Sequence, residues 1–453
     1  MIISVLRTRS LSMFRVYFYS CLLISLLFFV MFCFIDINKE IRPYQLIIHY
    51  SFTFASFFYV LLFLKCKQCD VLMLFCSTFI FQFLLAFLLK ICFVFFSTTP
   101  FGPSAIDSLG YFDYAKRGSA ATVSWFVNYL GNYTVWGKID DYGYLFYLRL
   151  LFQLFPSSSV PYIAIILNAL YISIGAIFMY KSMVLINKRK KRNAYVVTSV
   201  FSSFLFFVNS SAVGLKEDLF ICLIAISLYY LIRCAQKHDL ISLSLFVVST
   251  SLTLLFRASI TLIIVFSFFV YIVTTNNNKK LILILFLSSF IIMPFILDFI
   301  FTNLFGFSLQ HILDVANNRY EHTQNVPVYK QMGDMLAAVL GPFPSFTSSN
   351  DTMFYTFASL IKMIFNLPVL LALYVIIKKF RYRYYPIAFI YIIGMIFLII
   401  SGTGLDLRYQ IPFFISFLLL LFYSLNNIRV RKIYVCLYSI ACVFIIFLYN
   451  IMK

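Results

Sequence analysis

Charged side chains interrupt long apolar runs at a few short turns, and these side chains are the first candidates for chemistry. Lys216-Glu217-Asp218 follows a glycine between two apolar segments, and Arg257 stands in the turn Phe-Arg-Ala-Ser between two others. Guanidinium and ammonium groups bind phosphate, and a carboxylate accepts a proton from an attacking hydroxyl as a general base. Ionisable groups at membrane depth are costly, so they are candidates for a function.

The same pattern recurs in three other segments. Asp107 occurs in AIDSLGYFDY, Arg408 and Tyr409 occur in GTGLDLRYQIP, and Arg319 and His322 occur in NRYEHT. A histidine acts as an acid or a base near neutral pH. We therefore predict that the catalytic residues are Asp107, Glu217 and His322, and that the phosphate- or substrate-binding residues are Lys216, Arg257, Arg319, Arg408 and Tyr409.

Each of these residues also has an ordinary structural explanation. Asp107 fits a helix cap, and the Lys-Glu-Asp turn fits a solvated hairpin with an acid at a helix start. The Arg257 side chain could simply extend to the lipid headgroups, and His322 could be an exposed loop residue. Asp406 and Arg408 fit a pair that caps a helix. The sequence leaves these alternatives open.

Metal and cofactor chemistry have little support in the sequence. Cys66 and Cys69 form a CxxC, but no second CxxC or histidine pair completes a zinc site. The chain has no HExxH motif, no Gly-rich phosphate loop and no cluster of acids. We expect a metal-independent protein without a cofactor.

The composition indicates that these residues belong to a membrane protein. Of 453 residues, 62% are apolar and 11% are charged, which excludes a water-soluble globular protein. Arg7, Arg9 and Arg15 precede an apolar run that is too long for a signal-peptide core, so we predict a retained first helix. With about 20 apolar residues needed per crossing, we predict about 13 transmembrane helices in one all-α membrane domain. The predicted spans are 16–35, 45–64, 71–97, 160–186, 194–212, 219–233, 240–256, 258–274, 281–304, 354–377, 384–400, 410–427 and 433–450.

Charge orients these spans. If the N-terminus is cytoplasmic, the inner side holds 22 of the 36 Lys and Arg residues and two of the 16 acids. Basic residues collect in cytoplasmic loops, so this distribution supports the orientation. The net charge of +20 therefore lies on the inner face, and we expect no nucleic-acid partner. Two long loops, 98–141 and 305–353, fall outside with the candidate residues, and 142–156 and 335–346 are expected to be interfacial or re-entrant helices.

The order of these pieces resembles the bacterial Wzy-type polysaccharide polymerases and, more widely, membrane glycosyltransferases of the GT-C fold. Such polymerases rely on basic residues in two large outer loops, and Lys116, Arg117 and Arg319 lie in the two loops here. GT-C enzymes place a catalytic aspartate in the first outer loop, a role that the resemblance gives to Asp107 or Asp113. The resembling stretches are Ala105–Ala115, Tyr142–Pro156, Gly214–Leu219, Leu255–Ser259, Leu340–Pro344 and Arg408–Pro412.

The resemblance implies a reaction at the outer face of a bacterial inner membrane. An oligosaccharide on undecaprenyl diphosphate would be transferred to the next lipid-linked repeat unit, giving O-antigen or capsule chains. The implied partners are the polyprenyl-diphosphate-linked oligosaccharide, membrane lipid, a chain-length regulator and a flippase. Three rivals remain: a GT-C transferase that adds one sugar from a polyprenyl phosphate, a lipid-linked oligosaccharide flippase, and an assembly scaffold.

Overall fold

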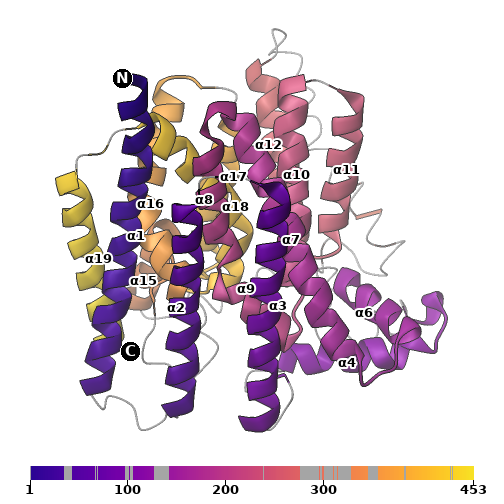
Figure 1. Ribbon diagram of the computed structural model, residues 1–453. Coiled ribbons are helices and arrows are strands. Elements are labelled where there is room, and N and C mark those ends of the chain that lie inside the picture. The colour runs from indigo at the N-terminus through magenta and orange to yellow at the C-terminus, as the bar shows by residue number, and fades with distance from the viewer. Residues whose placement is uncertain are drawn as a thin grey trace.

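A computed structural model defines the architecture (Figure 1). The structure describes residues 2–34, 43–66, 68, 70–96, 101–102, 106–126, 142–237, 239–275, 328–344, 356–381, 384–428, 430 and 432–452, with a few positions between 295 and 314. These residues are helical, and no strand occurs among them. The prediction of an all-α protein is therefore confirmed for this part of the chain.

The helices follow one another with short connections. Their bounds are α1 Ile2–Phe34, α2 Pro43–Lys65, α3 Val71–Phe96, α4 Ile106–Ser119, α6 Tyr142–Leu154, α7 Val160–Ile186, α8 Lys191–Ser202, α9 Leu205–Val213, α10 Glu217–Lys237, α11 Leu240–Leu254, α12 Ala258–Thr275, α15 Val328–Leu340, α16 Thr356–Lys378, α17 Tyr385–Ile400, α18 Leu407–Asn427 and α19 Lys432–Met452. A single 3₁₀ turn, Lys188–Lys190, precedes α8.

Eight of the described helices are long and apolar enough to cross a membrane, which makes this a multi-pass membrane protein. The count rises to nine if the bent pair α8–α9 is one span. Three more apolar helices, α11, α12 and α17, coincide with predicted spans but are shorter and are not counted among the eight. The predicted span 281–304 lies almost entirely outside the described residues. Hydropathy therefore located the helices well, whereas the total of 13 remains a prediction.

The bent pair α8–α9 is held by polar side chains of α3. A 40° bend separates the two helices at residues 203–204, and helix breaks at membrane depth need partners for the backbone groups that they release. Gln82 donates its amide to the Ser202 carbonyl at 2.6 Å, and the Thr78 hydroxyl donates to the Ser202 hydroxyl at 3.0 Å. The break explains why the apolar run 194–212 reads as one helix in the sequence but folds as two.

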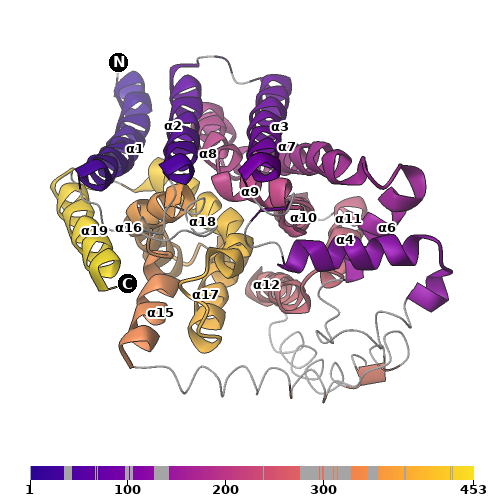
Figure 2. The same ribbon diagram turned by 90° about the horizontal axis from the view of Figure 1, so that it is seen from below.

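Helix α18 occupies the centre of the bundle. Within its membrane-length stretch 89% of the residues are buried, against 17% for α19 and 28% for α3 at the periphery. The central helix packs against α16 and α17 on one side and α10 on another (Figure 2). Because α18 is covered all round, its first turn is a rigid support for any side chain that it carries.

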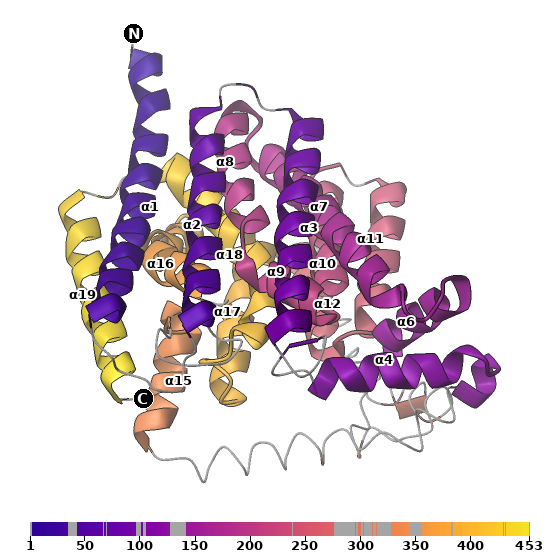
Figure 3. The ribbon, with the colours of Figure 1, turned by 60° about the horizontal axis from the view of Figure 1, so that its bottom comes forward.

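Helix direction alternates along the bundle, so that the turns rich in basic residues share one end. In Figure 3 the C-terminal end of α2 and the start of α3 lie at the upper end of the bundle, and α4 lies at the lower end. This is the arrangement that the charge distribution predicts. The end that carries the candidate residues is opposite to the end with the N-terminus.

Helix α4 crosses the lower end of the bundle instead of continuing along it (Figures 2 and 3). Arg149 of α6 ties its C-terminal end, because its guanidinium donates to the carbonyls of Gly118 at 3.0 Å and Ala121 at 2.7 Å. Gln153 donates to the Ser119 carbonyl at 2.9 Å. The two polar residues of segment 142–156 thus cap another helix, and through α4 they help to position Asp107.

We expect Arg149→Met to loosen the α4–α6 pair. Arg149 is buried, and removing it leaves two carbonyls without a charged donor, which costs about 2–3 kcal/mol. Denaturant unfolding in detergent, with amide hydrogen exchange of residues 106–121, measures the loss. The matched control is Arg117→Met, whose exposed pair with Asp113 makes a change below about 0.5 kcal/mol the expected result. Equal effects of the two substitutions would contradict the assignment.

Candidate functional site

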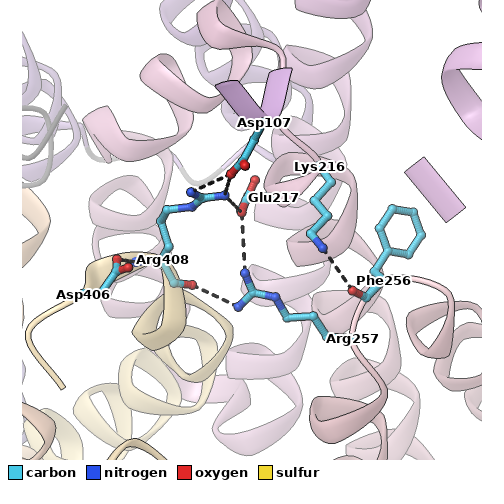
Figure 4. Close-up of polar contacts among 7 residues, drawn as sticks. All are labelled: Asp107, Lys216, Glu217, Phe256, Arg257, Asp406 and Arg408. Atoms are coloured by element: carbon cyan, nitrogen blue, oxygen red, sulfur yellow. Dashed lines mark hydrogen bonds and ion pairs between the residues drawn. The ribbon is translucent and has the colours of Figure 1, made fainter. Parts of the chain in front are cut away.

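Four helix starts meet at the lower end of the bundle. Asp107 lies in the first turn of α4, Glu217 begins α10, Arg257 immediately precedes α12, and Arg408 lies in the first turn of α18. Their side chains point toward one another from segments up to 301 residues apart in the chain (Figure 4). Helix N-termini carry partial positive charge, so the position favours an anion even before side chains are considered.

Glu217 is the centre of this cluster. Its side chain is 2% exposed, and its Oε1 lies 3.4 Å from an Arg408 nitrogen and 3.6 Å from an Arg257 nitrogen. One buried carboxylate oxygen therefore joins α10 to both the start of α12 and the start of α18. A buried charge is tolerated only where opposite charges and hydrogen bonds compensate it, and the two guanidinium groups meet that need.

Arg257 is fixed on several sides. Besides Glu217, it donates to the Arg408 carbonyl at 3.3 Å. Its guanidinium carbon lies 5.1 Å from the Tyr409 ring centroid and 5.8 Å from that of Phe220. Cation–π contacts of this kind hold an arginine without neutralising its charge. Tyr409, a predicted substrate-binding residue, thus acts here as a support for Arg257.

Arg408 contacts a second carboxylate nearer to the surface. Both of its terminal nitrogens lie 3.2 Å from the same oxygen of Asp107, Oδ2. The Asp107 side chain is 33% exposed, whereas Glu217 is almost completely buried. Because water screens a partly exposed pair, Asp107 is the weaker of the two anchors of Arg408. A competing anion could therefore displace Asp107 from Arg408 more easily than it could displace Glu217.

Lys216 and Asp406 complete the predicted turns. The Lys216 ammonium is directed away from Glu217 and donates to the Phe256 carbonyl at 3.4 Å, next to Arg257 (Figure 4). Asp406 caps α18 by accepting the Arg408 backbone N–H at 2.9 Å. Burial raises the pKa of the Asp406 carboxyl, although the hydrogen bond and the arginines oppose this shift. The cap interpretation of Asp406 is thus correct, and it coexists with the clustering of Arg408.

Gln410, Lys362 and Asp334 support the loop before α18. Gln410 donates to the carbonyls of Ala337 at 3.0 Å and Gly404, and its Oε1 accepts from the buried Lys362 ammonium. Asp334 of α15 accepts the Leu405 N–H at 3.1 Å. These contacts hold the loop that presents Arg408. Motif reasoning did not find Gln410, because a glutamine in an apolar run carries no charge signal, whereas Lys362 is visible as an intramembrane charge.

The structure brings together Asp107, Glu217, Arg257 and Arg408, with Lys216 and Tyr409 beside them. Arg319 and His322 lie outside the described residues, so their predicted roles stay predictions. Within the described part of the chain, no group of three or more His, Cys, Asp or Glu side chains is arranged to hold a metal ion. What the cluster offers is two guanidinium groups and a helix-dipole field, with one carboxylate at the surface to accept a proton.

Comparison with known proteins adds no assignment. No family model matches the chain, and no curated protein or solved structure shows detectable similarity to it.

The two carboxylates should differ strongly in their effect on stability. Glu217→Gln leaves two arginines without their shared buried anion and is expected to lower the free energy of unfolding by about 3–5 kcal/mol. Asp107→Asn removes a partly exposed pair, for which we expect a loss below about 1 kcal/mol. Thermal and denaturant unfolding of the purified protein in detergent measures both.

A double-mutant cycle separates the pair from general damage. Combining Glu217→Gln with Arg408→Gln should recover part of the loss, with a coupling of about 1–3 kcal/mol. Additive effects would contradict the central position of Glu217.

Proposed function

We propose that the protein is a membrane glycosyltransferase that polymerises undecaprenyl-diphosphate-linked oligosaccharide repeat units into O-antigen or capsule chains. In this proposal it acts at the outer face of the bacterial inner membrane, has about 13 transmembrane helices in a GT-C-like arrangement and keeps its N-terminus in the cytoplasm. The lipid-linked oligosaccharide is its substrate, membrane lipid surrounds it, and a flippase and a chain-length regulator are its partners.

The observation that supports this proposal is the pair of arginines at four converging helix starts. Arg257 and Arg408 share a single buried carboxylate, so their combined charge exceeds that of Glu217. A diphosphate is a bidentate, doubly charged ligand of the kind that guanidinium groups and helix N-termini bind. The cluster lies at one end of the bundle, and in this proposal that end is at the level of the diphosphate of a lipid-linked substrate.

The reaction assigns a role to each group. A hydroxyl oxygen of the acceptor sugar attacks the anomeric carbon of the donor, the bond from that carbon to the diphosphate oxygen breaks, and undecaprenyl diphosphate leaves. The arginines stabilise the negative charge that develops on the leaving group, which is the largest contribution that a fixed charge makes to such a step. A carboxylate takes the proton of the attacking hydroxyl.

Asp107 is the carboxylate best placed for that proton. It is partly exposed and holds Arg408 through one oxygen, so a diphosphate that binds Arg408 takes over the contact. Substrate binding thereby releases the base at the moment when it is needed. His322, also predicted as an acid or base, lies in the second outer loop and remains an alternative for this role.

The rival functions demand other features. A GT-C transferase that adds one sugar would use the same arginines, and products distinguish it from a polymerase. A flippase needs charged groups along a path through the whole membrane. The buried lysines Lys90 and Lys362 contact a backbone carbonyl and a glutamine, and they serve as helix supports rather than as steps of such a path.

The decisive experiment is deletion of the gene followed by a gel of surface-glycan lengths. Loss of the ladder with one capped unit retained supports a polymerase, whereas a ladder that persists would refute it. Complementation with Arg257→Ala or Arg408→Ala should leave the protein in the membrane and give single repeat units, with long chains reduced about 10²–10³-fold. Arg189→Ala, which changes an exposed arginine of the 3₁₀ turn Lys188–Lys190 outside the cluster, should restore the full ladder.

Substitution of the base should separate turnover from binding. For Asp107→Asn we expect kcat to fall about 10²–10⁴-fold with lipid-linked donor and acceptor, because the proton of the hydroxyl has no acceptor. KM for the donor should fall or stay the same, since the competing carboxylate of Arg408 is gone. A rise in KM with unchanged kcat would assign Asp107 to binding alone.

A further inference from the structure

A second polar cluster begins at the residue that follows Glu217. Asp218 follows Glu217 in the first turn of α10 and is completely buried. Its Oδ2 accepts the Ser211 hydroxyl at 2.9 Å, and Ser210 lies beside it. No cation forms an ion pair with Asp218 among the described residues. An isolated buried carboxylate costs several kcal/mol, so this charge needs compensation.

Unsatisfied oxygen atoms surround this carboxylate. The second oxygens of Asp218 and Glu217, Oδ1 and Oε2, are buried and accept no hydrogen bond from the described residues. The Ser210 hydroxyl, the Tyr144 hydroxyl and both side-chain atoms of Asn168 are also buried, and none makes a hydrogen bond of good geometry in that part of the chain, although Ser210 lies close to Asp218 and Asn168 close to Tyr144. Buried polar groups are nearly always paired, so several unpaired atoms in one place indicate a bound ligand.

The Tyr144 hydroxyl connects these groups in space. Burial raises its pKa, and the Asp218 and Glu217 carboxylates raise it further, because a phenolate would lie close to both charges. The Asn168 amide lies beside the same hydroxyl. Tyr144 is in α6, Asn168 in α7 and the carboxylates in α10, so three helices present oxygens to one location.

We propose that this cluster is a binding site for a hard monovalent cation of the Na⁺ type. The ligands are oxygens from Asp218, Glu217, Asn168, Tyr144 and Ser210, the donor type that hard cations prefer. A proton on Asp218 would satisfy only one hydrogen bond and leave the other oxygens unpaired. The four carboxylates of this region, Asp107, Glu217, Asp218 and Asp406, face three cations, Lys216, Arg257 and Arg408. One negative charge therefore remains, and it matches a monovalent cation better than a divalent one.

The proposed site shares Glu217 with the arginine cluster. A cation at Oε2 withdraws negative charge from the carboxylate that holds Arg257 and Arg408 through Oε1. The two arginines are then more available to an anion, and binding of the cation and of the anion reinforce each other. This coupling rests on the proposed function of the arginines, whereas the cation site itself does not.

Thermal unfolding of the purified protein in detergent tests the site without reference to activity. Saturating NaCl should raise Tm by about 2–4 °C relative to choline chloride of equal ionic strength. Asp218→Asn should abolish the difference, and Asp113→Asn, which changes an exposed aspartate of α4, should preserve it. An equal Tm in the two salts, or a difference that persists in Asp218→Asn, would overturn the proposal.

A milder variant keeps the test valid if Asp218→Asn does not fold. Tyr144→Phe removes one neutral oxygen and should move the NaCl concentration of half-maximal stabilisation about tenfold higher. A midpoint unchanged by this substitution would exclude Tyr144 and overturn the site as described. Stability that follows pH identically in both salts would assign a proton to Asp218 instead and would also overturn it.

Discussion

One buried carboxylate with two arginines determines how the lower end of this molecule is built. Glu217 cannot be buried alone, and its Oε1 is compensated by guanidinium groups that arrive from the start of α12 and the start of α18. The three helices must therefore begin at the same level and face one another. Gln410 holds the loop that leads into α18, and Arg149 holds the C-terminal end of α4, whose first turn carries Asp107.

The arginines stand where helix dipoles disfavour them. A cation is stabilising at a helix C-terminus and destabilising at an N-terminus, yet Arg257 and Arg408 both lie at N-termini. Three carboxylates offset this cost, Glu217 and Asp107 by ion pairs and Asp406 by its cap on α18. Local rules are broken in this way mainly at functional sites. The result is a surface-facing position that gains from any anion able to replace Asp107.

Sequence reasoning predicted much of this arrangement, for identifiable reasons. Twelve of the predicted spans coincide with helices of the described residues, one of them with the bent pair α8–α9. The cost of charge at membrane depth selected Asp107, Glu217, Arg257 and Arg408 before their contacts were known. What it missed depends on packing between distant segments. The break after Ser202 requires Gln82 of α3, and the orientation of α4 across the bundle requires Arg149 of α6; neither partner is adjacent in sequence. Asp218 appeared equivalent to Glu217, and only their contacts distinguish the carboxylate that pairs with two arginines from the one that accepts a serine hydroxyl.

The buried lysines show that helix ends govern charge placement through the rest of the bundle as well. Lys90 donates to the Ala212 carbonyl in the last turn of α9, and its ammonium lies 4.1 Å from the centroid of the Phe101 ring. Lys362 reaches the last turn of α15 indirectly, through Gln410 and the Ala337 carbonyl. Both cations thus lie at C-terminal ends, where the dipole favours them, and neither needs a carboxylate. Arg257, Arg408 and Lys216, by contrast, are cations at helix starts, against the dipole. A cation in a favourable position supports the fold, whereas one in an unfavourable position retains attraction for a ligand, and that difference supports the proposed binding site.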